Sequence, residues 1–251
     1  MTRFVLFDLD GTLIDTLNLY IRSVVQTLQA TGHNLLSLEE VLALRLNSEP
    51  RLMAHFYPSD EVEGAHRRFL ENYRGLHASY FDGVYPGVDG LLTSLRSRGI
   101  KMGIVSGKSR GAWAITREHA RLGAFDTLVF DDDVSAPKPD CEGLVKAMSN
   151  LGASPADTVY VGDSVDDLEA ATAAGVSFYA ALWSKSESET LAFEQAAAGI
   201  GPYAGVDHPG KVERLLQEVR TCHGEESTRW RSRPRRSTPC PITTIISIET
   251  T

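Results

Sequence analysis

Two aspartates near the N-terminus, Asp8 and Asp10, follow a short apolar run that begins at Phe4. In an extended strand, residues two apart point to the same side, so the two carboxylates would face the same way. Gly11 and Thr12 come next and turn the chain. Paired carboxylates at such a point can hold a cation, attack an electrophile and exchange protons with a leaving group. The pair therefore predicts catalysis at the end of the first strand.

Three later apolar runs are also followed by polar residues. Ser106 and Gly107 follow the second run, where a hydroxyl group beside a glycine amide can bind an anion. Lys138 lies between two prolines that stiffen its segment, and Asp163 and Asp167 follow the fourth run. Ligands of open parallel sheets bind beyond the carboxyl ends of the strands. We therefore expect all of these groups to form one site.

Together these groups predict phosphoryl transfer. Carboxylates from two strand ends can hold a hard cation such as Mg²⁺. Ser106, the amides near it and Lys138 can bind the equatorial oxygens of a phosphoryl group. An aspartate that attacks phosphorus forms an aspartyl-phosphate, which divides one hard step into two. A second aspartate can protonate the leaving oxygen and later deprotonate water.

Short apolar runs alternate with amphipathic segments along most of the chain. This alternation is typical of βαβ units and predicts an α/β fold with a parallel sheet that is covered on both faces. Helices are expected to end at Gly152 and Gly175, because glycine readily adopts a left-handed conformation. The expected strands are residues 4–9, 100–106, 127–130, 158–161 and 176–182.

Strand signals are missing from residues 16–86, where only helical patterns occur. Ser37 and Glu40 form a predicted capping box. A long helix follows, with an expected apolar stripe at Val62, His66, Phe69, Tyr73, Leu76 and Tyr80. We therefore expect residues 16–86 to form a helical subdomain, inserted into a core made of residues 1–15 and 87–223.

The composition excludes several classes of protein. The chain has 251 residues, of which 42% are hydrophobic, and a formal net charge of −8, as in an ordinary globular protein. Such an acidic chain would repel nucleic acid, and no apolar run reaches the roughly 18 residues of a membrane span. The 3 cysteines are widely spaced, which argues against a zinc site and favours a reducing compartment. We expect a cytoplasmic protein with no nucleic-acid or membrane partner.

Residues 224–251 differ from the rest of the chain. They contain five arginines and three prolines ahead of a β-prone end, a composition that cannot bury a core. We expect a disordered Arg/Pro-rich tail that is dispensable for folding and activity, with a docking or polyanion-binding arm as the alternative.

The chain resembles the haloacid dehalogenase-like hydrolases of the phosphatase type, and among them the phosphoglycolate phosphatases. Their fold is a Rossmann-like parallel sheet with an inserted α-helical cap. The motifs that carry the resemblance occur in the family's order and span residues 4–175. They are Asp8-Leu9-Asp10-Gly11-Thr12, Ser106, Lys138-Pro139 and Gly162-Asp163-Ser164-Val165-Asp166-Asp167.

The resemblance implies a role for each acidic residue of the motifs. Asp8 would be the nucleophile and a metal ligand, and Asp10 the general acid and base. Asp10 would also bind the metal through its backbone carbonyl. Asp163 would be a further ligand of Mg²⁺, and Asp167 a carboxylate that supports the ligands from behind.

The resemblance also implies how phosphate is bound. Ser106 and the Gly107 amide would hold the phosphoryl group, and Lys138 would neutralise both the nucleophile and the phosphate. The other acidic residues near the strand ends, Asp166 and residues 131–133, are expected to be solvated.

The acid at Asp10 favours hydrolysis of a phosphate ester or anhydride, since dehalogenating members of the family lack it. We expect a small phosphorylated metabolite as substrate and a monomer or homodimer as the assembly. Arg45, Arg51 and His55 are candidate substrate contacts in the cap, but a solvated helix face is the favoured interpretation of each.

Several other functions stay open at this point. A sugar phosphomutase, similar to β-phosphoglucomutase, or a pyrophosphatase would use the same core. A member that only binds phosphorylated ligands is disfavoured by the intact Asp8 and Asp10. A response-regulator receiver is also an α/β fold with acids and a lysine, but no helical insertion follows its first strand.

Overall fold

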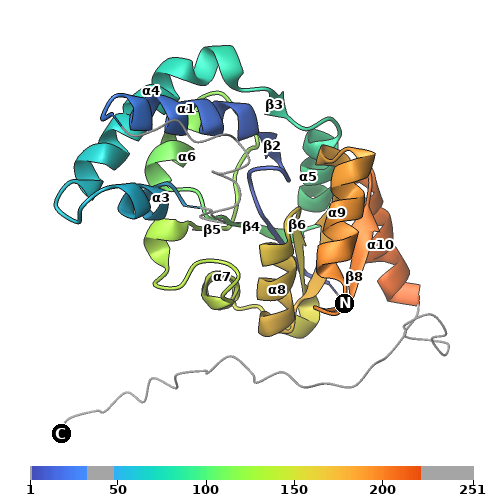
Figure 1. Cartoon of the computed structure of the whole chain (residues 1–251). Helices are drawn as coiled ribbons and strands as arrows, with labels where there is room; N and C mark the ends of the chain where they lie inside the picture. The colour runs from blue at the N-terminus through green and yellow to red at the C-terminus, as the bar shows by residue number, and fades with distance from the viewer. Residues whose placement is uncertain (1, 33–47, 222–251) are drawn as a thin grey trace, which may run out of the picture.

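The computed structural model describes residues 2–32 and 48–221 (Figure 1). The strands are β1 (Phe4–Phe7), β2 (Ile14–Asp15), β3 (Gly83–Val84), β4 (Lys101–Val105), β5 (Thr127–Val129), β6 (Thr158–Gly162), β7 (Ser177–Ala181) and β8 (Tyr203–Val206). The α-helices are α1 (Leu17–Gln29), α3 (Glu49–Phe56), α4 (Val62–Tyr80), α5 (Val88–Ser97), α6 (Arg110–Thr116), α7 (Glu142–Leu151), α8 (Val165–Ala174), α9 (Glu187–Ala197) and α10 (Pro209–Thr221). Short 3₁₀ helices are η1 (Asp131–Asp133), η2 (Pro155–Asp157) and η3 (Leu182–Ser184).

Six strands form one parallel sheet in the order β5-β4-β1-β6-β7-β8. From β1 the chain moves outward through β4 to β5, and it then returns to place β6 on the other side of β1. Crevices that bind ligands form at such reversals of strand order. The predicted α/β fold is confirmed, and the five predicted strands are present within one or two residues at each end. The edge strand β8 was not predicted.

The sheet is covered on both faces, and β1 shows how the sequence achieves this. Val5 and Phe7 belong to an apolar cluster with α5 and α10, whereas Phe4 and Leu6 belong to a cluster with α7 and α8. Successive side chains of a strand point to opposite faces, so an unbroken apolar run is required where both faces are buried. This burial fixes where β1 ends and therefore where Asp8 begins the loop.

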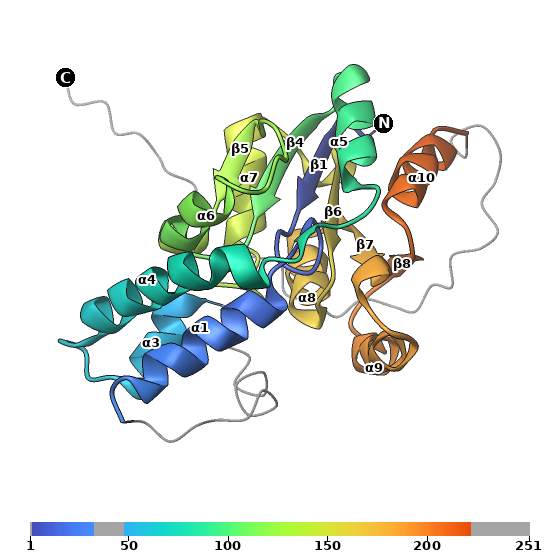
Figure 2. The ribbon, with the colours of Figure 1, turned by 90° about the horizontal axis from the view of Figure 1, so that it is seen from above.

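Helices α1, α3 and α4 lie together beyond the carboxyl ends of β1 and β4, as Figure 2 shows from above. They share an apolar cluster of their own, which also takes in Ala112 and Ile115 of α6. The chain leaves and re-enters the core through β2 and β3, which pair antiparallel. The predicted insertion of helices between the first two strands of the large sheet is confirmed.

The buried face of α4 differs from the predicted stripe. Phe69 and Tyr73 are fully buried as expected, but the face continues through Ala65 and His77. Leu76 is only partly buried. The reason is that α4 contacts α1, α3 and α6. In the turn that follows α6, His119 stacks on His77 with ring centroids 4.2 Å apart.

Some predictions fall outside the described residues. They are the capping box at Ser37 and Glu40, the candidate contact Arg45, and the Arg/Pro-rich tail 224–251. Within residues 2–32 and 48–221, no helix is both long and apolar enough to cross a membrane.

Candidate active site

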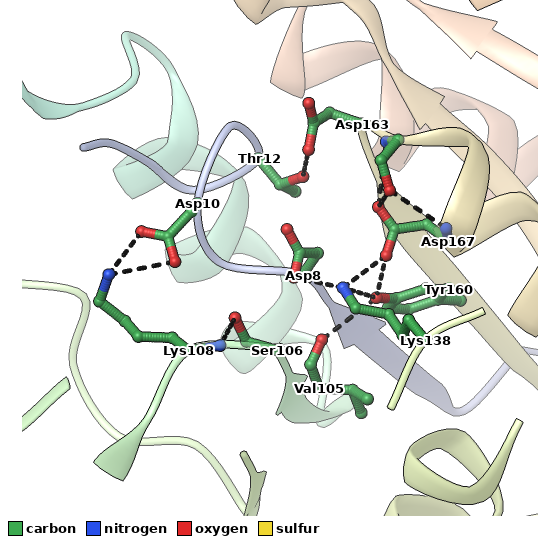
Figure 3. A network of polar contacts seen from close by, with 11 residues as sticks. Asp8, Asp10, Thr12, Val105, Ser106, Lys108, Lys138, Tyr160, Asp163 and Asp167 are labelled. Atoms are coloured by element: carbon green, nitrogen blue, oxygen red, sulfur yellow. Dashed lines mark hydrogen bonds and ion pairs between the residues drawn. The ribbon is translucent and has the colours of Figure 1, made fainter. Parts of the chain in front are cut away.

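The polar residues at the strand ends meet in one cavity of about 340 Å³. The predicted site residues that line it are Asp8, Asp10, Ser106, Gly107, Lys138 and Asp163. They come from the ends of β1, β4 and β6 and from the segment after η1. Figure 3 shows all of them except Gly107 around the end of β1. The parallel topology thus brings together residues that are up to 155 positions apart in the sequence.

Lys138 links two of the carboxylates. Its Nζ lies 2.7 Å from Oδ1 of Asp8 and 2.6 Å from Oδ1 of Asp167, and it donates to the Tyr160 hydroxyl at 3.2 Å. Burial opposes the charge on Lys138, but the two carboxylates outweigh it and raise the pKa of the ammonium well above its usual value. Lys138 is therefore a permanently charged group beside Asp8.

Asp167 lies beneath the cavity rather than in its wall, and it is fully buried. It caps its own helix: Ser164 donates its backbone N–H and its hydroxyl to Oδ2 at 3.0 and 2.6 Å. Tyr160 donates to Oδ1 at 2.7 Å. Burial disfavours the charged form of Asp167, yet Lys138 and these donors outweigh it and hold its pKa below the usual value. Asp167 is thus a fixed anion that anchors Lys138.

The pKa of Asp8 is shifted in the opposite direction from that of Asp167. Burial raises its pKa to about 8, Asp167 and Asp163 add to the rise, and Lys138 opposes it. Asp163 is also raised by burial, while Lys185 at 2.8 Å opposes the rise. Crowded carboxylates of this kind are stabilised as anions when a cation joins them.

The acidic cluster fits a hard cation. Asp8, Asp163 and Asp167 each offer a carboxylate oxygen, and these oxygens lie within 4.8 Å of one another. Gly11 adopts a left-handed φ of 81°, and a Cβ there would lie 2.7 Å from Cγ of Asp163. Glycine is therefore required for the loop after β1 to pass Asp163. All-oxygen donor sets of this kind suit Mg²⁺.

Ser106 is mostly buried at the end of β4, where its N–H donates to the Val129 carbonyl at 3.0 Å. Its hydroxyl accepts the backbone N–H of Lys108 at 3.3 Å. The loop from Ser106 to Ser109 is therefore tightly turned, and Gly107 lies at the cavity wall within it. A hydroxyl beside glycine in such a loop is suited to bind an anion.

The Asp10 carboxylate points away from Asp8. Lys108 Nζ lies 2.9 and 3.2 Å from its two oxygens, and the Thr16 hydroxyl also donates to it. Figure 3 shows Asp10 and Lys108 on the opposite side of the β1 loop from the cluster of Asp8, Lys138 and Asp167.

Several residues that line the cavity were not among the predicted site residues, and they include Lys108, Lys185 and Glu49. Lys108 directly follows the predicted Ser106-Gly107 pair, so its place in that motif was a usable signal. Lys185 comes three residues after the predicted strand 176–182, so the end of that strand was a usable signal as well. Glu49 follows no strand end that the sequence marks, and only the packing of α3 brings it to the cavity.

Three predictions about neighbouring residues need correction. Asp166 and Asp131 were expected to be solvated, but they are only 5% and 7% exposed. The Arg51 Nε lies 2.9 Å from Oδ1 of Asp131, so Arg51 is tied to η1 and does not line the cavity. His55 is exposed on α3 and does not line the cavity, which confirms the solvated helix face favoured for it. Asp132 is exposed, as expected.

Comparison with known proteins gives a consistent family. The model of the haloacid dehalogenase-like hydrolases matches residues 5–181. Pyrophosphatase PpaX of Bacillus velezensis is 34% identical over 193 residues, which cover 74% of this chain and 86% of the relative. Phosphoglycolate phosphatase 1 of Pseudomonas aeruginosa is 30% identical over 204 residues, which cover 77% and 74%. The crystal structure of β-phosphoglucomutase from Clostridium difficile has a TM-score of 0.72 over 90% of this chain and all of that one, and at 16% identity the likeness is one of fold.

Proposed function

The chain belongs to the haloacid dehalogenase-like hydrolases and is a phosphatase of that family, and we propose that it hydrolyses a small phosphorylated metabolite with Mg²⁺ through an aspartyl-phosphate. The observation that carries the proposal is the convergence of Asp8, Ser106 and Lys138 on one cavity, with the Asp8–Lys138 ion pair at 2.7 Å. A nucleophile, a phosphate-binding loop and a neutralising cation within one cavity are what phosphoryl transfer requires.

Asp8, Asp163 and the backbone carbonyl of Asp10 would hold the Mg²⁺ ion. When bound, the ion cancels charge between the attacking carboxylate and the phosphate. Its fit is supported by the carboxylate oxygens of Asp8, Asp163 and Asp167, which lie within 4.8 Å of one another. Burial, with a smaller contribution from neighbouring carboxylates, raises the pKa values of Asp8 and Asp163, and a bound cation would offset that rise. Asp167 would support the site through Lys138 and Ser164, because its oxygens already accept from both.

In the first step, a carboxylate oxygen of Asp8 attacks phosphorus, and the bond from phosphorus to the leaving oxygen breaks. Ser106, the Gly107 amide and Lys138 hold the transferred group, and Asp10 gives a proton to the leaving oxygen. In the second step, Asp10 takes a proton from a water molecule that attacks phosphorus. The bond from Asp8 to phosphorus then breaks, and phosphate leaves.

Residues 16–86 would act as a cap over this chemistry. Leu17 and Tyr20 of α1 and Glu49 of α3 line the same cavity as Asp8, so the insertion supplies part of its wall. A wall of this kind can exclude water while the aspartyl-phosphate forms and can select the leaving group. A cavity of about 340 Å³ fits a small metabolite.

Pyrophosphate hydrolysis is a second candidate function, because the relative that is 34% identical is named a pyrophosphatase. Pyrophosphate has a phosphate as its leaving group, so the same steps apply to it. A sugar phosphomutase is the remaining alternative on this core, and the likeness to β-phosphoglucomutase concerns the fold.

The proposal is tested by measuring phosphate release with Mg²⁺ from phosphoglycolate, sugar phosphates, nucleotides and pyrophosphate. We expect release from at least one of them, and none after replacement of Asp8 by asparagine. For a sugar 1-phosphate, formation of the 6-phosphate without release of phosphate would instead identify a mutase. Activity that survives in the Asp8→Asn variant would contradict the proposed nucleophile.

A further inference from the structure

A second buried lysine borders the cavity and has no part in the chemistry described so far. Lys108 follows the phosphate-binding pair Ser106 and Gly107, and its side chain is only 2% exposed. Its ammonium contacts both oxygens of Asp10, at 2.9 and 3.2 Å. The Asp10 side chain is 35% exposed, so Asp10 is the accessible member of the pair.

Lys108 is held on its other sides by groups of the helical insertion. Its Nζ lies 5.0 Å from the ring centroid of Tyr73 on α4. Glu49 at the start of α3 is 2% exposed, and its Oε2 accepts the backbone N–H of Ser109 at 2.7 Å. The charges of Asp10 and Glu49 and the nearby Tyr73 overcome the effect of burial and raise the pKa of Lys108.

This arrangement limits what Lys108 can do. A buried ammonium is stable only where it is paired, and here the pairing is with the two oxygens of Asp10. The predicted phosphate site already has Lys138 on the other side of the β1 loop (Figure 3). Lys108 is therefore better placed to fix the orientation of Asp10 than to bind the phosphoryl group.

We propose that Lys108 is a positioning residue for Asp10, and that Glu49 of α3 holds in place the loop that carries Lys108. The inference rests on the proposed function, in which Asp10 is the general acid and base. It makes α3 part of the catalytic assembly, because Glu49 accepts a backbone hydrogen bond from Ser109 in the Ser106–Ser109 loop.

The consequence is a dependence on the leaving group. A general acid matters most for a basic leaving oxygen and least for a weakly basic one. If Lys108 acts through Asp10, its loss should slow the reaction of poor leaving groups selectively. A structural defect would instead lower all rates alike, and a direct contact with substrate would appear mainly in KM.

The experiment measures kcat and KM for dinitrophenyl, nitrophenyl and phenyl phosphate, whose leaving oxygens become progressively more basic. The variants are Lys108→Met, Lys108→Arg and Asp10→Asn. Lys211→Met is the matched control, since it removes a lysine from an exposed ion pair on α10. Because Lys108→Met leaves the buried Glu49 without the nearby positive charge that offsets its desolvation, the double variant Lys108→Met/Glu49→Gln is measured as well.

We expect Lys108→Met to reduce kcat for phenyl phosphate at least about tenfold more than kcat for dinitrophenyl phosphate. KM should stay within about threefold, and Asp10→Asn should show the same trend more strongly. Lys108→Arg should restore most of the loss, since arginine keeps the charge. The double variant should show the same selective loss if Lys108→Met alone does not fold, and Lys211→Met should match the wild type.

Two outcomes would overturn parts of this account, and they can be told apart. If Asp10→Asn shows no leaving-group dependence, the role of Asp10 in the proposed function is wrong, and the inference is wrong with it. If Asp10→Asn shows the dependence but the Lys108 variants lose all rates equally, or change mainly KM, only the inference is overturned.

Discussion

The cavity is bordered by two buried lysines, each associated with two carboxylates, and the two groups are built differently. The Lys138 cluster contains Lys138, Asp8 and Asp167, all from the core. The Lys108 cluster contains Lys108, Asp10 and Glu49, and Glu49 comes from the helical insertion. The Lys138 cluster therefore depends on the α/β core alone, whereas the Lys108 cluster also depends on how α3 packs on the core.

The two clusters have different proposed functions in the same site, one in attack on the phosphoryl group and the other in proton transfer. The groups of the Lys138 cluster lie where the nucleophile and the phosphoryl group are proposed to meet. The Lys108 cluster includes Asp10, the proposed acid and base. Glu49 of the insertion contacts the loop that carries Lys108, so the position of α3 should affect the position of Asp10. Substitutions in the Lys138 cluster should slow turnover of every substrate. Substitutions in the Lys108 cluster should slow most the substrates whose leaving oxygen is most basic.

The largest effect is expected at Asp8. Asp8→Asn should lower kcat by about 10⁴-fold or more, because an amide cannot attack phosphorus. The fold should persist, since Lys138 keeps Asp167 as its partner. Steady-state phosphate release and thermal unfolding measure the two quantities. Near-normal turnover would show that Asp8 is not the nucleophile and that the Lys138 cluster takes no part in the reaction.

Removal of the metal should come next. Chelation should abolish phosphate release, and added Mg²⁺ should restore it, because crowded acidic groups otherwise face an anionic substrate. Asp163→Asn should raise the Mg²⁺ concentration for half-maximal activity by at least about tenfold. A titration of activity against Mg²⁺ checks this, and full activity after exhaustive chelation would contradict it.

Stability should respond to the Lys108 cluster. Lys108→Met should lower the free energy of unfolding by about 1–3 kcal/mol, because the buried Glu49 then loses the nearby positive charge that offsets its desolvation. The double variant Lys108→Met/Glu49→Gln should recover much of that loss. Urea unfolding measures both. An equal loss in the single and double variants would show that Glu49 and Lys108 are not energetically coupled.

The smallest effect is expected at Arg51, which joins α3 to the core away from the cavity. Its side chain is 36% exposed, so its ion pair with Asp131 should contribute at most about 1 kcal/mol. Arg51→Ala should therefore leave KM for metabolites and for nitrophenyl phosphate unchanged. A selective rise in KM for a metabolite would instead indicate that Arg51 contacts the substrate.

The two clusters also show how far the sequence could lead. Asp8, Lys138 and Asp163 follow apolar runs, and parallel topology places all strand ends at one edge, so their meeting was predictable. The direction of the Asp10 side chain was not, because Lys108 and Thr16 determine it. Glu49 meets Ser109 across 60 positions of sequence, and no local pattern reports how α3 packs.

The same contrast holds for the fold. Strands β1, β4 and β6 carry continuous apolar runs because helices cover both of their faces. Strand β8 is a partly exposed edge strand of four residues that includes Gly205, so it lacks that signal. The buried face of α4 was shifted from the predicted one because three other helices contact it.

The central claim is that Asp8 carries the phosphoryl group during turnover. It is tested most directly by rapid acid quench during hydrolysis, reduction of acyl phosphates with borohydride, and peptide mapping by mass spectrometry. The account predicts that reduction marks the peptide containing Asp8, and that the mark is absent in Asp8→Asn and without substrate. A mark on any other residue, or its absence from Asp8 throughout the first turnover, would contradict it.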